Sequence, residues 1–262
     1  MSRTFDALVK AGIESETRKR RNGQRRAGVS FNPLSVFKDK RHPVKIDFDL
    51  DPFVEEQYHR LRLHLLPNSK RPAIQVVMVA ATDHGEGGTT TAAILASTLA
   101  RSVKSKILLV DANLRTPALN EVFEPGQSYK LLGLSDKVLS EIPLDQTIYE
   151  TDIPNLFFMP CGRAVSSPSY VFDNELMGAM LPALRERFDF VIFDGSPLRD
   201  YSDSCFLAEK MDGVILVIEA ERTKAEVLRK IRKDLESTGV KILGIVLNKK
   251  RQYIPDYIER FL

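Results

Sequence analysis

The chain has 262 residues, of which 43% are hydrophobic and 28% charged, and a formal net charge of +3, which is ordinary for a globular protein. Twelve Lys/Arg against four Asp/Glu fall within residues 1–45, so this segment carries +8 and the remainder is acidic. The longest apolar runs, such as residues 76–81 and 214–218, are too short to span a bilayer, and the first 21 residues contain no apolar stretch of the signal-peptide kind.

The first 50 residues are predicted to form a basic, largely disordered arm. Apolar residues at helical spacing predict a short helix over residues 1–17, whereas glycines and prolines interrupt residues 18–50. Such an arm either binds an acidic surface, with lipid or protein favoured over nucleic acid, or is a solvated leader. Both interpretations stay open. The sequence therefore predicts an arm at 1–50 and one larger domain at 51–262.

The predicted domain begins with a helix over residues 53–66, and short apolar runs then alternate with helical stretches. The apolar runs predict strands at 73–81, 106–112, 155–160, 189–194, 213–220 and 241–248. Helices are predicted at 89–101, 169–187, 203–211 and 223–238. Strands that are apolar throughout and separated by helices predict an α/β fold, a doubly wound, mostly parallel sheet covered on both faces. Ligands bind such sheets at the carboxyl ends of the strands.

A glycine-rich loop follows the first strand and reads Thr82-Asp83-His84-Gly85-Glu86-Gly87-Gly88-Thr89-Thr90. Glycines permit a tight loop whose N–H groups point at phosphate oxygens, and the next helix presents its positive N-terminus to the same anion. Thr89 stands where a hydroxyl ligates Mg²⁺ in P-loops, but Gly88 occupies the position of the usual lysine. A plain strand–helix turn without a ligand is the alternative.

Two acidic residues end predicted strands at the same sheet edge. Asp111 ends the second strand and Asp194 the fourth. In that position an aspartate typically holds Mg²⁺ or its water, although it can also simply cap the next turn. Three loops that converge at one edge favour a nucleotide site. The two cysteines, Cys161 and Cys205, have no metal-ligand spacing and fit a reducing compartment.

Taken together, these motifs resemble the ATPase domain of bacterial tyrosine autokinases (BY-kinases), which serve capsule and exopolysaccharide export. That family reads A-P-G-E-G-K-S/T, L-L-x-D-A-D-x-R-x-P, D-Y-x-x-x-D-x-P-P, D-A-x-x-L-A and V-L-N. The chain reads HGEGGT at 84–89, LLVDANLRTP at 108–117, DFVIFDGSP at 189–197, DSCFLA at 203–208 and VLN at 246–248. The resemblance covers about residues 50–250.

The resemblance implies a P-loop NTPase fold that binds ATP or ADP with Mg²⁺. It assigns catalytic roles to Asp111, Asp194 and Arg115, and metal contacts to Thr89, Asp111 and Asp194. Nucleotide contacts are assigned to Gly85, Glu86, Gly87, Gly88, Thr89, Thr90 and Asn248. It also implies a membrane-bound polysaccharide chain-length regulator or export protein as partner, a cytoplasmic location at the inner face of the membrane, and self-association through residues 53–66.

The departures from the family pattern predict impaired chemistry. Gly88 replaces the lysine, and Asn113 replaces the second aspartate of the acidic motif. The assembly motif E-x-x-R-x-x-R is reduced to Glu56, His59 and Arg62, and the tyrosine-rich tail to Tyr253 and Tyr257.

We therefore expect a pseudo-kinase that binds nucleotide weakly and acts by docking to a partner, with an active tyrosine autokinase as the alternative. A partitioning ATPase is disfavoured because its signature lysine is missing near Thr82 and Asp83. An iron–sulfur scaffold ATPase is disfavoured because paired cysteines are missing.

Overall fold

The structure, a computed structural model, describes residues 52–65, 74–102, 105–119, 131–200 and 203–250. The predicted N-terminal arm and its helix, and both tail tyrosines, lie outside these residues. No helix within the described ranges combines the length and apolar character needed to cross a membrane.

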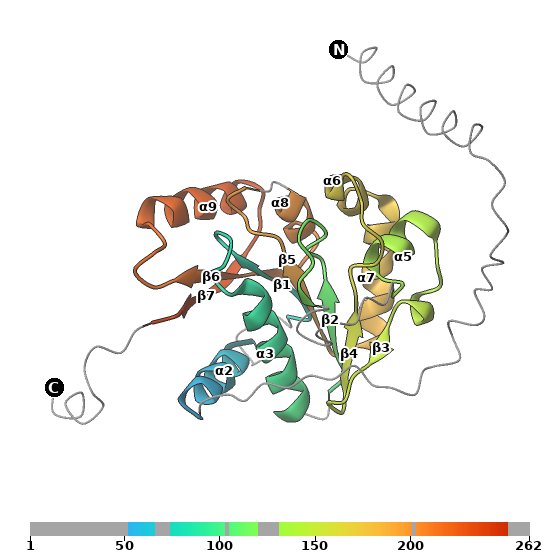
Figure 1. Cartoon of the computed structure of the whole chain (residues 1–262), viewed down its shortest axis with the longest axis horizontal. Coiled ribbons are helices and arrows are strands. Elements are labelled where there is room, and N and C mark those ends of the chain that lie inside the picture. Colours follow the sequence, from blue (N-terminus) through green and yellow to red (C-terminus); the bar gives the residue numbers. More distant parts are fainter. Residues whose placement is uncertain (1–51, 66–73, 103–104, 120–130, 201–202, 251–262) are drawn as a thin grey trace, which may run out of the picture. The chain divides into compact units, whose positions relative to one another are not determined.

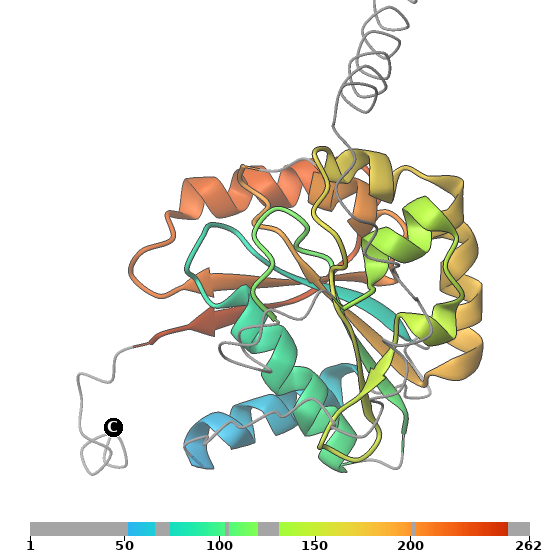
Figure 2. The same cartoon turned by 45° about the vertical axis from the view of Figure 1, so that its right-hand side comes forward.

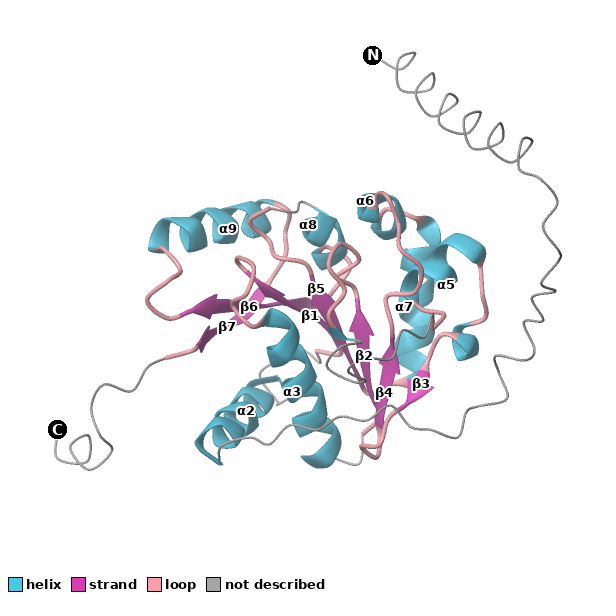
Figure 3. Ribbon diagram, in the orientation of Figure 1, coloured by secondary structure: helices cyan, strands magenta, loops and turns pink. Residues whose placement is uncertain are grey.

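The domain is built on a seven-stranded sheet with the strand order β3-β4-β2-β5-β1-β6-β7 (Figure 1, Figure 3). Its strands are β1 (Val76–Ala81), β2 (Ile107–Asp111), β3 (Tyr149–Glu150), β4 (Leu156–Met159), β5 (Phe190–Gly195), β6 (Gly213–Glu219) and β7 (Ile242–Asn248). Every pairing is parallel except that of β3 with β4. The predicted doubly wound, mostly parallel sheet is confirmed.

Helices cover both faces of the sheet. One face packs against α2 (Pro52–Leu65) and α3 (Gly88–Ser102), and the other against α5 (Leu134–Ser140), α6 (Pro168–Phe172), α7 (Glu175–Arg187), α8 (Asp203–Ala208) and α9 (Ala225–Ser237) (Figure 2). Along β1, Val77 and Val79 lie in the core beneath α3, whereas Met78 and Ala80 lie in the core of the opposite face. Burial on both sides explains why the strands are apolar at every position.

The fold differs from the sequence prediction in two respects. The single helix expected over 169–187 is two helices, because the Asn174 side chain accepts a hydrogen bond from the Leu176 N–H at 2.9 Å and caps a new start. The short elements α5, η2 (Leu144–Gln146) and β3 were not predicted, since none is long enough to show a periodic pattern.

The amino end of β1 is fixed by one partly buried carboxylate. Asp212 accepts hydrogen bonds from the N–H groups of Gln75 and Val76, each at 2.8 Å, and a paired contact from the Arg185 guanidinium at 2.7 and 2.9 Å. Paired hydrogen bonds of this kind are geometrically specific. Strand β1, which leads into the glycine loop at its carboxyl end, is therefore also fixed at its amino end.

Candidate functional site

The glycine loop joins β1 to α3 and adopts a conformation that only glycine readily tolerates at two points. Gly85 and Gly87 have φ values of +78° and +93°, which lie in the region that L side chains rarely adopt. A Cβ atom on residue 87 would lie 2.2 Å from Asn248 Nδ2. The loop therefore turns tightly, as the sequence predicted, and it packs against the end of β7.

Glu86 is the buried centre of this loop. One carboxylate oxygen accepts hydrogen bonds from the Thr82 and Asp83 N–H groups, both at 2.9 Å, and from the Thr82 hydroxyl at 2.6 Å. The other oxygen accepts from the Thr223 hydroxyl, which follows β6. Sequence reasoning assigned Glu86 to the nucleotide. The carboxylate is instead used inside the protein, which leaves the backbone N–H of Glu86 for a ligand.

Substituting Glu86 with Ala is expected to lower the free energy of unfolding by about 2–4 kcal/mol, because it leaves several buried donors without an acceptor. Urea denaturation monitored by circular dichroism measures this change. The matched control is Glu209→Ala at an exposed position just after α8, which should stay within about 0.5 kcal/mol of the parent chain. Equal effects of the two substitutions would show that the Glu86 contacts do not stabilise the loop.

Further contacts hold the loop from outside. The Asn248 side chain donates to the Glu86 carbonyl at 2.8 Å, and Lys249 Nζ donates to the Gly85 carbonyl at 2.6 Å. On the other side, Arg199 pairs with Asp83 at 2.7 Å. Sequence reasoning predicted a role for Asn248 but missed Lys249 and Thr223. Only the position of Lys249 directly after the V-L-N motif could have pointed to it.

A pair of carboxylates lies at the carboxyl edge of the sheet beside the loop. Asp111 and Asp194 are directly opposite each other in the register of β2 and β5, and both are fully buried. One oxygen of Asp111 accepts from the Asn113 N–H at 3.1 Å. The other oxygen of Asp111 and both oxygens of Asp194 have no well-formed hydrogen bond among the described residues. Unsatisfied buried acceptors of this kind call for a ligand.

The environment of this pair disfavours its negative charge. Burial raises the pKa of Asp111 to about 7, against the opposing effect of the Asn113 and Leu119 N–H groups. Burial, and then the neighbouring Asp111 charge, raises the pKa of Asp194 well above its ordinary value, and the nearby Thr89 hydroxyl offsets part of that rise. Two like charges removed from water in this way repel each other unless a cation neutralises them.

The donor set fits Mg²⁺. Thr89, in the first turn of α3, and the two aspartates offer only oxygen ligands, which Mg²⁺ prefers. Within the described ranges no group of three or more His, Cys, Asp or Glu side chains is placed to hold a metal. A small number of protein ligands is usual for Mg²⁺, whose other ligands are water and phosphate oxygens. Asp111 and Asp194 lie opposite each other and the Thr89 hydroxyl lies near Asp194, so the three residues predicted to hold the metal lie together.

Asn113 is tied into the protein by its side-chain carbonyl. This oxygen accepts from the Ser196 hydroxyl at 2.8 Å and from the Thr116 N–H and hydroxyl at 3.2 and 3.3 Å. The side chain is buried, and an amide has no ionisable proton to exchange with an acceptor hydroxyl. The position therefore supplies local structure and no general base.

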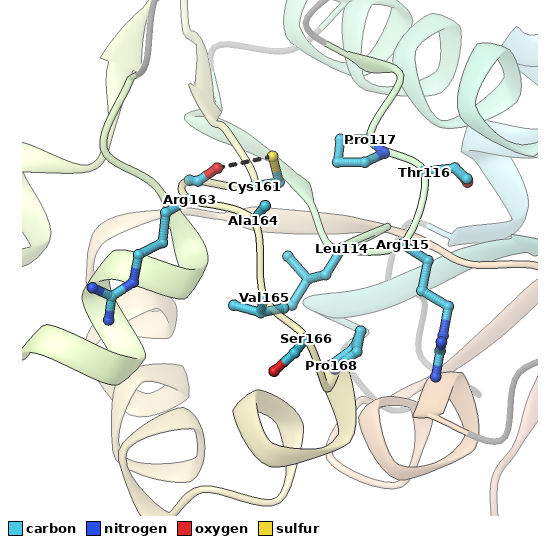
Figure 4. Close-up of a pocket in the computed structure, with 11 residues that line it drawn as sticks. Leu114, Arg115, Thr116, Pro117, Cys161, Arg163, Ala164, Val165, Ser166 and Pro168 are labelled. Atoms are coloured by element: carbon cyan, nitrogen blue, oxygen red, sulfur yellow. Dashed lines mark hydrogen bonds between the residues drawn. The ribbon is translucent and has the colours of Figure 1, made fainter. Parts of the chain in front are cut away.

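Arg115 was expected to act in catalysis, and the structure places it in an ion pair with Asp203 at the start of α8. Its Nε donates to that carboxylate at 2.7 Å, and the Ser169 hydroxyl of α6 donates to the same carboxylate. Arg115 also lines a cavity of about 420 Å³ between residues 114–117 and 161–168. In Figure 4, Leu114 and Val165 lie close together within this lining, and Arg115 and Arg163 extend to opposite sides.

Cys161 forms part of the wall of this cavity and is not suited to nucleophilic chemistry. Burial, and then the nearby Asp111 charge, raises the pKa of its thiol to about 12. The thiol therefore stays protonated at neutral pH, and only the thiolate is a good nucleophile. Cys161 and Cys205 are both free.

Comparisons with known proteins point in one direction. Residues 74–242 match the AAA domain family. The chain is 30% identical over 203 residues to the tyrosine-protein kinase CpsD of Streptococcus agalactiae serotype III (strain NEM316), covering 78% of this chain and 85% of CpsD. It is 29% identical over 196 residues to the tyrosine-protein kinase YwqD of Bacillus subtilis (strain 168), covering 75% of this chain and 81% of YwqD.

Solved structures give the same result for the fold. The VpsO kinase domain has a TM-score of 0.68 at 30% identity, with 76% of this chain and 96% of that domain covered. The chimerical protein CapA2B2 has a TM-score of 0.72 at 24% identity, with 80% and 95% covered. The domain fold is thus that of a tyrosine-kinase domain of the P-loop type.

Proposed function

The chain belongs to the bacterial tyrosine-kinase (BY-kinase) family of P-loop ATPases, and from this membership we propose that it is a nucleotide-binding pseudo-kinase that regulates capsule or exopolysaccharide biosynthesis and export. In this role it docks to a membrane-bound chain-length regulator or export protein at the inner face of the membrane. Its basic arm over residues 1–50 and its ATPase-like domain over 51–262 act together there.

Nucleotide binding is supported by the loop and its surroundings. The loop is already shaped for an anion, and α3 directs its positive N-terminus at the same point. Thr89, Asp111 and Asp194 would hold Mg²⁺, which would neutralise phosphate charge. We expect ADP or ATP to bind weakly because a charge-assisted hydrogen bond, worth about 1.5–3 kcal/mol, is missing at residue 88.

Impaired transfer rests on one observation above all, the close packing of Gly88. A Cβ atom at this position would lie 3.0 Å from the Ala81 backbone nitrogen and 3.2 Å from the Ala81 Cβ. The loop is thus closed against the end of β1 where the family carries its lysine. Phosphoryl transfer depends on positioning and charge stabilisation, so the loss of a cation there lowers the rate more than the affinity. The neutral Asn113 adds to this loss.

Docking through α2 is supported by the ion pairing within the helix and by its exposed apolar side chains. Glu56 pairs with Arg60 at 3.2 Å, so the acidic residue of the assembly motif already has a partner within the helix, and the His59 ring lies 3.6 Å from Glu55. Phe53 and Leu63 are 69% and 61% exposed. We propose that α2 contacts a partner or a second copy mainly through apolar residues, and that ring assembly through charge is weak.

Two measurements test the proposal. The purified chain given ATP and Mg²⁺, and the chain recovered from its native host, should show little signal on an anti-phosphotyrosine blot. A crosslinking pull-down from the same host should recover a membrane protein. A strong blot signal that disappears in the Tyr253→Phe/Tyr257→Phe variant would overturn the proposal and establish the active autokinase instead.

A further inference from the structure

A cluster of charged side chains lies against the outer side of the glycine loop, at the carboxyl ends of β6 and β7. Its centre is Glu219, whose carboxylate pairs with Arg222 at 2.9 Å and with Lys249 at 3.1 Å. None of the three was singled out by the sequence motifs. Two cations share this carboxylate, and Arg222 also lies near the Asp83 and Glu86 carboxylates.

Lys249 contacts the loop itself, and Arg222 lies beside it. Lys249 Nζ donates to the Gly85 carbonyl at 2.6 Å. The guanidinium of Arg222 lies 3.5 Å from where a Cβ atom of residue 85 would be. Gly85 belongs to the cradle whose N–H groups would face the phosphates. A positive charge that touches this residue is therefore within a side chain's reach of a bound nucleotide.

The backbone of Lys249 is fixed in place, and within the described chain its ammonium group keeps one donor that can bind a phosphate. It adopts φ +54°, which is uncommon for a residue other than glycine, and its own N–H donates to the Asn248 side chain at 2.9 Å. An ammonium group has three donors, and among the described residues Lys249 uses two of them, on Gly85 and Glu219. Its side chain is 48% exposed, so a phosphate can approach the third.

Another cation beside the loop is already neutralised. Arg199 pairs with Asp83 at 2.7 Å, and Arg222 also acts on that carboxylate. Lys249, which contacts the loop and keeps an unused donor among the described residues, is therefore the cation best placed beside the loop that lacks its lysine.

We propose that Lys249, with Arg222 beside it, supplies to the nucleotide phosphates the positive charge that Gly88 cannot supply. The inference rests on the proposed nucleotide binding and goes further by naming the residues that replace the missing cation within the same chain.

The test is isothermal titration of the full chain with ADP in the presence of Mg²⁺, compared with adenosine. Lys249→Met should weaken ADP binding by about tenfold or more, the loss of one charge-assisted contact. Adenosine binding should change less than about twofold, because adenosine has no phosphate. Lys249→Arg should recover most of the ADP affinity, since the charge returns. The matched control is Lys250→Met, which removes the same charge from the next residue, and should bind ADP like the parent chain.

Each remaining outcome separates the alternatives. If Lys249 only fastens the loop, Lys249→Met should weaken adenosine and ADP equally and lower the melting temperature of the nucleotide-free chain, and the inference is then overturned. The inference is also overturned if Lys249→Met and Lys250→Met bind ADP alike. A parent chain that binds neither ADP nor ATP at millimolar concentration overturns the proposed function together with this inference.

Discussion

Replacing Asp194 with Asn is expected to stabilise the nucleotide-free chain and to abolish the Mg²⁺-dependent part of nucleotide binding. Both oxygens of Asp194 are buried without a well-formed hydrogen bond in the described part of the chain, and Asp111 lies opposite across the β2–β5 pairing. Removing one charge removes the cost of its burial and the repulsion between the pair. The same change removes a ligand for Mg²⁺.

The pH dependence follows from the raised pKa values. A carboxyl group whose pKa is higher in the folded than in the unfolded chain binds its proton more tightly when folded. The contribution of such a carboxyl group to folding stability is therefore complete below its unfolded-state pKa, about 4. It is lost as the pH rises through the folded-state pKa, which is about 7 for Asp111. We expect the nucleotide-free chain to lose stability across this window and Asp194→Asn to lose less.

Differential scanning fluorimetry between pH about 4 and about 8, a range that brackets these pKa values, measures the effect. At pH about 7.5 the variant should melt at least about 3 °C above the parent, since 1 kcal/mol shifts the melting temperature of a domain this size by about 2–4 °C. Asp173→Asn, an exposed position after α6, is the control and should change nothing. A variant that melts below the parent at every pH would show that Asp194 stabilises the fold as it stands.

Restoring both family residues, in the variant Gly88→Lys/Asn113→Asp, is expected to raise ATP turnover by about 100-fold or more. A lysine returns positive charge to the transferring phosphoryl group, and a carboxylate returns near the acceptor. The aspartate should fit without rearrangement, because the Asn113 side-chain oxygen already accepts from the donors of Ser196 and Thr116. The lysine requires Ala81 to move by a few tenths of an ångström, as the 3.0 Å contact of the Gly88 position indicates.

Phosphate release is the measurement, because it does not depend on an acceptor tyrosine. The single variants should each gain less than the pair, since groups that act in one transition state are not additive. Gly178→Lys on α7 is the matched control, because a Cβ atom there meets nothing within 4 Å. A parent chain that turns over ATP as fast as the double variant would contradict the account of Gly88 and Asn113.

Much of the fold was readable from the sequence, and the reason is burial. Strands that are apolar at nearly every position, such as β1 and β5, occur where helices cover both faces, so their order in the chain and parallel pairing could be predicted. The convergence of Asp111 and Asp194 followed from the same argument, since both end neighbouring strands. Short elements such as β3 lack a period and were missed.

The sequence could not predict which groups the side chains of the loop region contact. Glu86 stands in a motif that predicts contact with a nucleotide, yet its carboxylate turns to Thr82, Asp83 and Thr223 because these donors surround it in the folded chain. Thr223 is 137 residues away from Glu86 in the sequence. Lys249 likewise gains its place only when β7 lies beside the loop. Contacts between distant segments follow from the fold, and local pattern does not record them.

The support that Glu86 gives to the glycine loop has a kinetic consequence. With Thr82, Asp83 and Thr223 all bonded to one buried carboxylate, the loop keeps its shape whether or not an anion is present. A receptor that is ordered in advance loses little conformational entropy when its ligand arrives. Nucleotide can therefore enter in a single diffusive step, and differences in affinity among loop variants will be expressed mainly in how fast the nucleotide leaves.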